Sequence, residues 1–283
     1  MSTSETVWFI TGASSGFGRA FASYAIKRGY SVAATARDVR NLDSLVKQAP
    51  SRVLALKLDV TREDEVGRAI QAAVARFERI DVLINNAGFG LVGAVEETPM
   101  GEWRAAMETM FFGAIAMTRA ALPTLRAQGA GAVVNISSMG GQMSTAGFGA
   151  YSAAKFALEG ASEALAQELA PFGIKVLIVE PGAFRTGFAG GALRHMPVME
   201  PYREVVGGTR DFARSMNETQ EGDPIKAAAA IDDALRAEKT PLRLQLGGDA
   251  IAAVRAHAEA LLADLVAWEA RGTDVKLDEG TAA

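Results

Sequence analysis

The sequence predicts an α/β fold in which a doubly wound, predominantly parallel sheet of seven strands carries helices on both faces. Short β-type apolar runs alternate with helix-forming stretches, which is the pattern of parallel strands joined by crossover helices. The runs at 82–84 and 176–179 are apolar at every position, as strands buried on both faces must be. A glycine-rich turn directly after the first run is the third indication.

The individual elements follow from this alternation. We expect strands near 7–11, 31–36, 52–58, 81–85, 131–136, 174–180 and 242–246. We expect helices near 16–28, 39–47, 62–78, 99–128, 150–171, 222–238 and 249–270. No low-complexity linker divides the 283 residues, so we expect one domain over 1–283 with a variable lid near 184–221.

The composition excludes several classes of function. The net charge of −4 and the pI near 5.4 give no general attraction to nucleic acid or to an anionic membrane. No apolar run approaches the roughly 18 residues that span a bilayer, and the polar start is not a signal peptide, so we expect a cytoplasmic protein. The chain has no cysteine, and His195 and His257 show no ligand spacing, so we expect no metal site.

The residues after the first strand form a turn suited to phosphate. Three glycines spaced Gly-x-x-x-Gly-x-Gly lead directly into a helix. Glycine lets the backbone come close to a ligand, and a helix start offers unpaired N–H groups and a positive dipole end. A lone turn of this kind is often only a tight turn, but its position after the first strand favours a pyrophosphate site. The candidate residues are Gly12, Ser14, Ser15, Gly16, Phe17 and Gly18.

Tyr151 and Lys155 stand four residues apart in a helical stretch, and Ser138 lies thirteen residues before the tyrosine. Positions i and i+4 share one helix face, so the lysine ammonium is expected near the phenol. A neighbouring cation favours phenolate and would lower the pKa of Tyr151 towards neutrality. The pair alone is also compatible with an amphipathic surface, so its interpretation depends on the residues around it.

Polar and glycine residues recur at the ends of the expected strands. They follow the first six strands in turn, and the carboxyl ends of parallel strands meet at one edge of the sheet, where ligands bind. The sequence therefore predicts one shared site at this edge. The residues that mark it are Gly12, Arg37, Asp59, Asn86, Gly88, Ser138, Pro181 and Gly182.

Taken together, these motifs resemble the short-chain dehydrogenase/reductase family, whose marks are Thr-Gly-x-x-x-Gly-x-Gly, Asn-Asn-Ala-Gly, a serine and Tyr-x-x-x-Lys. The chain carries them at 11–18, 85–88, Ser138 and 151–155, in that order, and the resemblance covers about residues 7–188. It implies a Rossmann-like fold and an NAD(P)-dependent oxidoreductase with Ser138, Tyr151 and Lys155 as catalytic residues. Ser137 is the nearest alternative serine, but the thirteen-residue spacing favours Ser138. The resemblance also implies a homodimer or homotetramer formed through the long fourth and fifth helices.

The same resemblance assigns residues to parts of the cofactor. Asp59 and Val60 would border the adenine, and the 86–88 segment would lie on the ribose side. Lys155 would bind the nicotinamide ribose, in addition to its role beside the tyrosine. The remaining residues implied by the resemblance are Asn86, Ala87, Gly88, Tyr151, Pro181, Gly182 and Thr186.

The end of the second strand indicates which cofactor is preferred. Recognition of a free ribose 2′-hydroxyl usually requires a carboxylate there, whereas a 2′-phosphate requires a cation. Ala36 takes the usual acidic place and Arg37 follows it, with Ser14 or Arg40 able to assist. We therefore expect NADP(H), while Asp38 leaves NAD as the alternative.

Met110 is a departure from the family pattern. Many members have an asparagine three residues before a glycine on the long fourth helix, where it helps to hold a water that relays protons to the lysine. Met110 takes this place before Gly113, and a thioether cannot donate a proton. The chain is then either an active enzyme with a rerouted relay, for instance through Thr109, or a low-activity or regulatory dinucleotide-binding protein.

The substrate is predicted only by class. Methionine and phenylalanine residues near the site would form adaptable apolar walls, which favours a hydrophobic ketone, aldehyde or alcohol. The alternatives are that these residues only pack the lid on the sheet, or that Arg185, Arg194 or Arg203 binds an anionic tail. The candidate pocket residues are Met139, Met143, Phe148, Phe184 and Phe188.

The last long helix carries one apolar stripe. Its members alternate at spacings of three and four residues, which places them on one face. We expect this face to pack on the helix's own domain, with a subunit contact as the alternative. The members are Ile251, Val254, Ala258, Leu261, Leu265 and Trp268.

Overall fold

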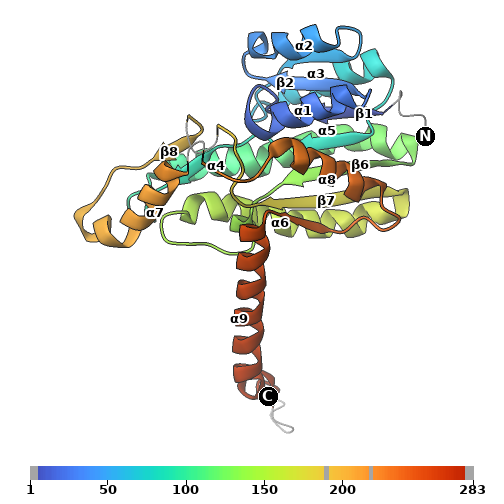
Figure 1. Cartoon of the computed structure of the whole chain (residues 1–283). Helices are drawn as coiled ribbons and strands as arrows, with labels where there is room; N and C mark the ends of the chain where they lie inside the picture. Colours follow the sequence, from blue (N-terminus) through green and yellow to red (C-terminus); the bar gives the residue numbers. More distant parts are fainter. Residues whose placement is uncertain (1–5, 188–190, 217–218, 278–283) are drawn as a thin grey trace.

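The computed structural model describes residues 6–187, 191–216 and 219–277 (Figure 1). Seven parallel strands form the central sheet in the order β3-β2-β1-β4-β6-β7-β9. The winding reverses between β1 and β4, which confirms the predicted doubly wound sheet. The strands are β1 Val7–Ile10, β2 Ser31–Ala36, β3 Val53–Lys57, β4 Val82–Asn85, β6 Gly131–Ile136, β7 Ile174–Pro181 and β9 Arg243–Leu246.

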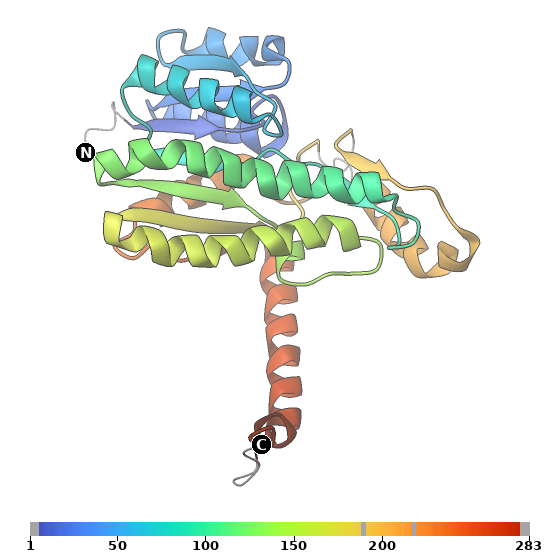
Figure 2. The same ribbon diagram turned by 180° about the vertical axis from the view of Figure 1, so that it is seen from behind.

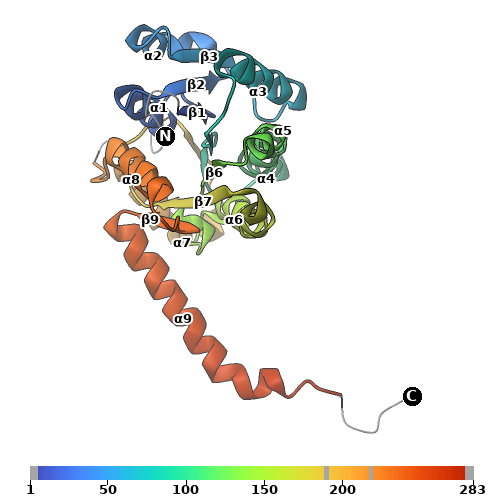
Figure 3. The same ribbon diagram turned by 90° about the vertical axis from the view of Figure 1, so that its right-hand side faces the viewer.

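Helices cover both faces of this sheet, as Figure 3 shows along the sheet edge. One face packs on α1 Gly16–Lys27, α2 Asp43–Gln48 and α8 Pro224–Arg236, and the other on α3 Glu63–Phe77, α5 Gly113–Gln128 and α6 Gly149–Leu169. Figure 2 shows the second of these layers from the front. Alternation within β1 illustrates the division, because Trp8 and Ile10 belong to the first core and Phe9 to the second.

The expected long helix at 99–128 is divided into three parts. It consists of α4 Met100–Met107, a π-helical turn at Glu108–Phe112 and α5. Single π turns inside α-helices frequently mark functional sites. Short 3₁₀ turns lie at Val39–Leu42, Met139–Gly141, Ala170–Phe172 and Glu200–Tyr202.

A lid lies beside the sheet and contains elements that the sequence did not predict. Its β8, Leu193–His195, pairs in parallel with β5, Gly90–Val92, and its helix α7 spans Arg203–Ser215. The ion pair between Arg210 and Glu97, 2.6 Å long, joins the lid to the body with both side chains almost fully buried. Burial raises the pKa of Glu97, but backbone N–H groups of Met199 and Ala94 and the Arg210 guanidinium outweigh it and lower this pKa overall.

The last helix, α9 Gly248–Thr273, leaves the body instead of packing on it (Figures 1 and 3). Only Ala250 on this helix is buried, and Leu261, Leu265 and Trp268 are 57%, 61% and 70% exposed. The expectation that the apolar stripe packs on its own domain is therefore wrong. Gly247, the residue between β9 and the helix, has a φ of +100°, a backbone conformation that glycine adopts easily and other residues disfavour.

No helix among residues 6–187, 191–216 and 219–277 is long and apolar enough to cross a membrane.

Candidate active site

A cleft of about 1010 Å³ opens at the carboxyl ends of the strands, where the winding reverses. It brings together residues from strand ends that are far apart in the sequence. Phe188 lies outside the described residues, and Gly18 lies beneath the cleft wall. The predicted residues that line the cleft are Gly12, Ser14, Ser15, Gly16, Phe17, Arg37, Asp59, Val60, Asn86, Ala87, Gly88, Ser138, Met139, Met143, Phe148, Tyr151, Lys155, Pro181, Gly182, Phe184 and Thr186.

The glycine turn has the shape that a pyrophosphate needs. Gly12 and Gly16 adopt φ values of +67° and +54°, which side chains disfavour. A Cβ on Gly18 would collide with the carbonyl oxygen of Gly12 and with the amide of Asn86, so a larger residue cannot stand there. Ser15 precedes α1 without capping it by its side chain, and the first turn of the helix has no acidic residue. The helix start is therefore open to an anion.

The two asparagines of the 85–88 motif have different structural positions. Asn85 is buried and donates to Asn135 at 2.8 Å, which ties β4 to β6. Asn86 donates from Nδ2 to the carbonyl of Thr11 at 2.8 Å, and its own backbone N–H donates to Thr11 Oγ1 at 2.8 Å. Because these bonds join the loop after β4 to the glycine turn, the motif shapes the end of the cleft that contains this turn.

Arg37 and Asp38, at the end of β2, differ in whether their charged groups already have a partner. Arg37 is exposed, lines the cleft and makes no ion pair with any residue that the structure describes. Asp38 is held by Arg40, whose Nε and Nη2 donate to the carboxylate at 2.9 Å and 2.6 Å. The side-chain hydrogen bond from Arg40 lowers the pKa of Asp38. The carboxylate is thus already partnered, while the guanidinium of Arg37 is available to a ligand.

Ser138 and Tyr151 form the polar centre of the cleft. The side chains are hydrogen-bonded to one another, and Ser138 Oγ also accepts from the backbone N–H of Gly140 at 3.0 Å. Ser137 instead points into the protein, where its Oγ has no hydrogen-bond partner among the described residues. The geometry therefore joins Ser138, and not Ser137, to the tyrosine.

The pKa of Tyr151 does not follow the expectation from the sequence. Burial raises it to about 12, and only the hydrogen bond with Ser138 lowers it. Lys155 lies one helical turn away with its Nζ 5.7 Å from the centre of the phenol ring, but this ammonium donates to the carbonyl of Ile136 at 2.7 Å. The cation is therefore directed at the backbone of β6. Burial lowers the pKa of Lys155 itself to about 8, against the opposing charge of Glu159.

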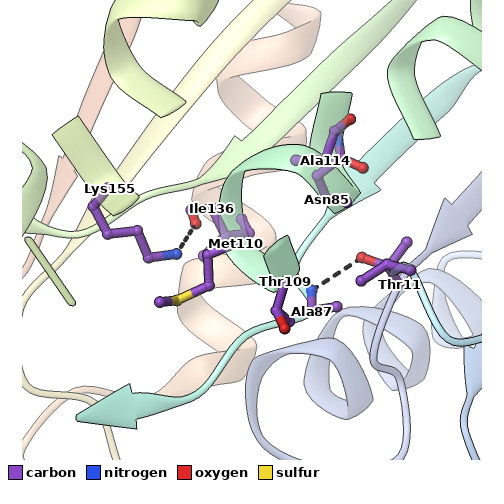
Figure 4. Close-up of a pocket in the computed structure, with 10 residues that line it drawn as sticks. Thr11, Asn85, Ala87, Thr109, Met110, Ala114, Ile136 and Lys155 are labelled. Carbon is purple, nitrogen blue, oxygen red and sulfur yellow. Dashed lines mark hydrogen bonds between the residues drawn. The ribbon is translucent and has the colours of Figure 1, made fainter. Parts of the chain in front are cut away.

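Met110, in the π-helical turn, lies beside Lys155 of α6 and is 2% exposed. Figure 4 shows its thioether on the side of the lysine ammonium, at a cavity of about 10 Å³. Thr109, Asn85 and Lys155 contribute to the cavity wall. This is about the space of one water molecule, and a water there needs two to four polar partners. The methionine thus leaves room for a water although it cannot bind one strongly.

A buried polar cluster supports the tyrosine and lysine from behind. Glu159, one turn after Lys155, accepts from Arg243 at 3.0 Å and from Gln142 at 2.9 Å. Glu180 on β7 shares both donors at 3.2 Å. Burial raises the pKa of Glu180 to about 7. The cluster joins α6, β7, β9 and the loop after Ser138, and so fixes the backbone that positions the site.

The other end of the cleft has a largely apolar wall. The ring of Phe148 lies 6.2 Å from that of Tyr151, and Phe184 packs against Phe17 at 5.1 Å. Two lining residues outside the predicted pocket also meet here, because the Arg194 guanidinium lies 3.9 Å from the centre of the Phe89 ring. Their contact depends on the β5–β8 pairing, which gives no signal in the sequence.

Asp249 is a lining residue that could have been predicted. Its Oδ2 accepts from the backbone N–H of Ala183 at 2.7 Å and its carboxylate lies against Gly182, so the first turn of α9 fixes the loop after β7. The rule that polar residues at strand ends meet at one edge applies to β9 as well as to the first six strands. Applied to Leu246 and the residues after it, that rule points to Asp249.

Comparison with known proteins agrees with this geometry. A family model described as short chain dehydrogenase matches residues 6–196. The chain is 40% identical to the oxidoreductase BOA17 of Botryotinia fuckeliana, over 93% of this chain and 96% of that protein. It is 38% identical to a 3-ketodihydrosphingosine reductase of Bacteroides thetaiotaomicron, over 84% and 86% of the two chains.

Solved structures give the same result. A short-chain dehydrogenase from Streptomyces avermitilis is 52% identical with a TM-score of 0.92, over 97% of this chain and 100% of that one. A Burkholderia cenocepacia relative in complex with NADP is 27% identical with a TM-score of 0.73, over 96% and 98%. A Brucella melitensis 3-ketoacyl-(acyl-carrier-protein) reductase complexed with NADH is 25% identical with a TM-score of 0.70, over 87% and 99%. This chain therefore belongs to the short-chain dehydrogenase family and is an oxidoreductase.

Proposed function

We propose that the protein uses NADP(H) to interconvert a hydrophobic ketone or aldehyde and the corresponding alcohol. The observation that carries this proposal is the Ser138–Tyr151 hydrogen bond in the same cleft as the glycine turn at 12–18. Bound NADP(H) would supply or accept the hydride, and the chain would supply orientation and a proton. The residues that would hold it are those of the glycine turn, Arg37 and the 86–88 segment.

The proton would pass through Tyr151. In the reducing direction the substrate oxygen lies between Ser138 Oγ, which donates a hydrogen bond to it, and the phenol, which transfers its proton to it. In the oxidising direction the phenolate takes the proton from the alcohol. Since burial holds the pKa of Tyr151 at about 12, the charged form needs a stabilising cation, and Lys155 is the ammonium beside the ring.

The preference for NADP(H) rests on Arg37. Its guanidinium lines the cleft without an ion-pair partner among the described residues, and it can hold two oxygens of a 2′-phosphate at once. The competing carboxylate of Asp38 is paired with Arg40 and so is a poor acceptor for a ribose hydroxyl.

The apolar wall supports a hydrophobic substrate. Met139, Met143 and Phe148 line one side of the cleft, and Phe212 and Met216 of the lid line another. The relative from Bacteroides thetaiotaomicron, a 3-ketodihydrosphingosine reductase, is named for a long-chain ketone and supports the same class.

The experiment that tests the proposal is the oxidation of NADPH, with NADH in parallel, against a series of ketones and aldehydes of increasing chain length. Tyr151→Phe serves as the blank. We expect turnover that prefers NADPH, rises with chain length and disappears in the variant. Turnover that persists in Tyr151→Phe would exclude the tyrosine as the proton donor.

A second candidate function, a regulatory protein that binds the dinucleotide but turns over slowly, is favoured by one observation. Met110 lines the cavity beside Lys155 at the position where the family resemblance expects an asparagine. Met110→Asn tests it directly. If the methionine limits proton transfer, the asparagine variant turns over several-fold faster at unchanged cofactor affinity. An unchanged rate means that the relay already runs by another route.

A further inference from the structure

The projecting helix α9 presents an apolar stripe that the rest of the chain leaves uncovered. Beyond its first turns the helix runs away from the body (Figures 1 and 3). Water-exposed apolar side chains in one stripe are unusual on a monomer and mark an interaction surface. The exposed large hydrophobic residues on this helix are Ile251 46%, Leu261 57%, Leu262 61%, Leu265 61%, Val266 61% and Trp268 70%.

The stripe has the period of a coiled coil. The six positions predicted from the sequence alternate strictly by three and four residues over two and a half heptads; four of them are among these exposed residues, while Leu262 and Val266 flank the stripe. Ile251, Ala258 and Leu265 take the first apolar position of each heptad, and Val254, Leu261 and Trp268 take the second. Most positions on the opposite side are alanine, the strongest helix former, so the helix does not need the body to hold its shape.

A lipid surface is a poor match for this helix. Helices that lie on membranes are usually rich in lysine and arginine on their polar face. Here four carboxylates stand against two arginines. The helix is therefore net acidic, and anionic lipid headgroups would repel it. The acidic residues are Asp249, Glu259, Asp264 and Glu269, and the basic residues are Arg255 and Arg271.

We propose that the stripe is an interface with a second copy of this chain, in which the two α9 helices pair antiparallel. The register that matches all six positions places Ile251 opposite the partner's Trp268, Val254 opposite the partner's Leu265, and Ala258 opposite the partner's Leu261. Small and large side chains then face each other, whereas a parallel pair would set tryptophan on tryptophan and alanine on alanine.

The flanking charges favour the antiparallel orientation. In a parallel pair, the residue directly before the first apolar position of a heptad lies beside the partner residue that directly follows the second apolar position. This would place Asp264 beside the partner's Glu269, and the symmetry of the pair would repeat the contact. In the antiparallel register His257 instead faces the partner's Asp264, again twice by symmetry. Like charges are thus separated, and an imidazole that can donate a hydrogen bond meets a carboxylate.

Analytical ultracentrifugation of the whole protein tests the interface. Leu261→Lys with Leu265→Lys places two charges in the seam, and the matched control, Ala256→Lys with Ala263→Lys, places two charges on the exposed opposite side. Leucine, alanine and lysine are all good helix formers, so far-ultraviolet circular dichroism should not change. We expect the particle mass of the seam variant to be half that of the wild type, and the control to keep the wild-type mass. Equal masses in all three proteins would overturn the proposal, as would a halved mass in the control.

Disulfide trapping tests the orientation, because the natural chain has no cysteine. In the antiparallel pair Ile251→Cys alone forms no intermolecular disulfide, and Ile251→Cys combined with Trp268→Cys forms two. A disulfide in the single variant would overturn the antiparallel orientation. Sedimentation of the wild type with phosphatidylcholine–phosphatidylserine vesicles, lost in the seam variant, would overturn the second copy in favour of lipid. Neither measurement depends on catalysis, so the outcome is separate from that of the proposed function.

Discussion

Lys155 follows Tyr151 by one helical turn, yet its ammonium donates to the carbonyl of Ile136 at 2.7 Å and is 5.7 Å from the centre of the phenol ring. The lysine side chain is therefore anchored to strand β6 by a hydrogen bond. Its position near the ring comes from the helix, and its direction comes from the strand. Four predictions follow from this geometry and from the surrounding contacts.

Ser138→Ala should lower kcat about 100-fold, since it removes one hydrogen-bond donor from the reacting oxygen. Ser137→Ala is the matched control, because Ser137 is the adjacent serine and its buried hydroxyl lies against Gly141 and has no part in the hydrogen bond to Tyr151. We expect a small change of kcat in the control. Steady-state kinetics at saturating cofactor measures both. Equal losses in the two variants would refute the assignment of Ser138.

Lys155→Met should change how stability depends on pH in the cofactor-free protein. The folded pKa of Lys155 is about 8, below its usual 10.5, so the unfolded chain binds this proton first as the pH falls. As the pH falls from 10.5 to 8, the unfolding free energy of the wild type therefore decreases by about 3 kcal/mol. The variant lacks this decrease. Urea unfolding across this range measures the difference. Parallel curves for the two proteins would contradict the lowered pKa.

Arg210→Met should detach the lid from the body. It leaves Glu97 charged and buried, which costs about 3 kcal/mol of unfolding free energy and raises KM for the substrate more than the Kd for cofactor. Because the folded pKa of Glu97 is lowered from 4.5, the stability due to this pair is complete above about pH 4.5 and is lost as the pH falls further.

The control for this lid variant is Arg203→Met. Arg203 pairs with Glu200 on the same lid, but the two side chains are 67% and 78% exposed. Its loss should cost less than about 1 kcal/mol. If Arg210→Met lost no more unfolding free energy than Arg203→Met, the buried pair would not be what holds the lid.

Arg37→Ala should weaken NADPH binding about 10- to 100-fold and leave NADH binding nearly unchanged, since only NADPH carries the 2′-phosphate. Lys47→Ala, which removes an exposed cation on α2 outside the cleft lining, controls for the change in net charge. Isothermal titration of the wild type and both variants with each cofactor measures the six affinities. Equal weakening of both cofactors in Arg37→Ala would remove the argument for NADPH.

The central sheet was predictable because its strands are short apolar runs separated by helices, and burial on both faces makes inner strands such as β1 and β4 apolar along most of their length. Gly12 and Asn86 were predictable for a related reason, because parallel strands place their ends at one edge. The same rule would have included Asp249. Tyr151 was predictable from its spacing to Lys155 on one helix face. The features encoded by a local sequence pattern are therefore the ones that the structure contains where they were expected.

The remaining features depend on contacts that no local pattern contains. The three-residue strands β5 and β8 are about a hundred residues apart in the chain, and their pairing alone brings Arg194 to Phe89. The expected lowering of the pKa of Tyr151 by Lys155 is absent, because a carbonyl on β6 sets the direction of the lysine side chain. Whether the apolar stripe of α9 packs on the body is likewise not encoded in its periodicity, which is the same for a helix that packs on its own domain and for one that projects from it.

The bonds from Asn86 to Thr11 have an energetic consequence for ligand binding. They hold the glycine turn in its φ-positive shape within the folded chain itself. The conformational entropy of that turn is therefore lost when the protein folds and not when a nucleotide arrives. Preorganisation of this kind leaves more of the gross contact energy as affinity. A substitution at Asn86 would accordingly weaken binding even where the side chain touches no ligand atom.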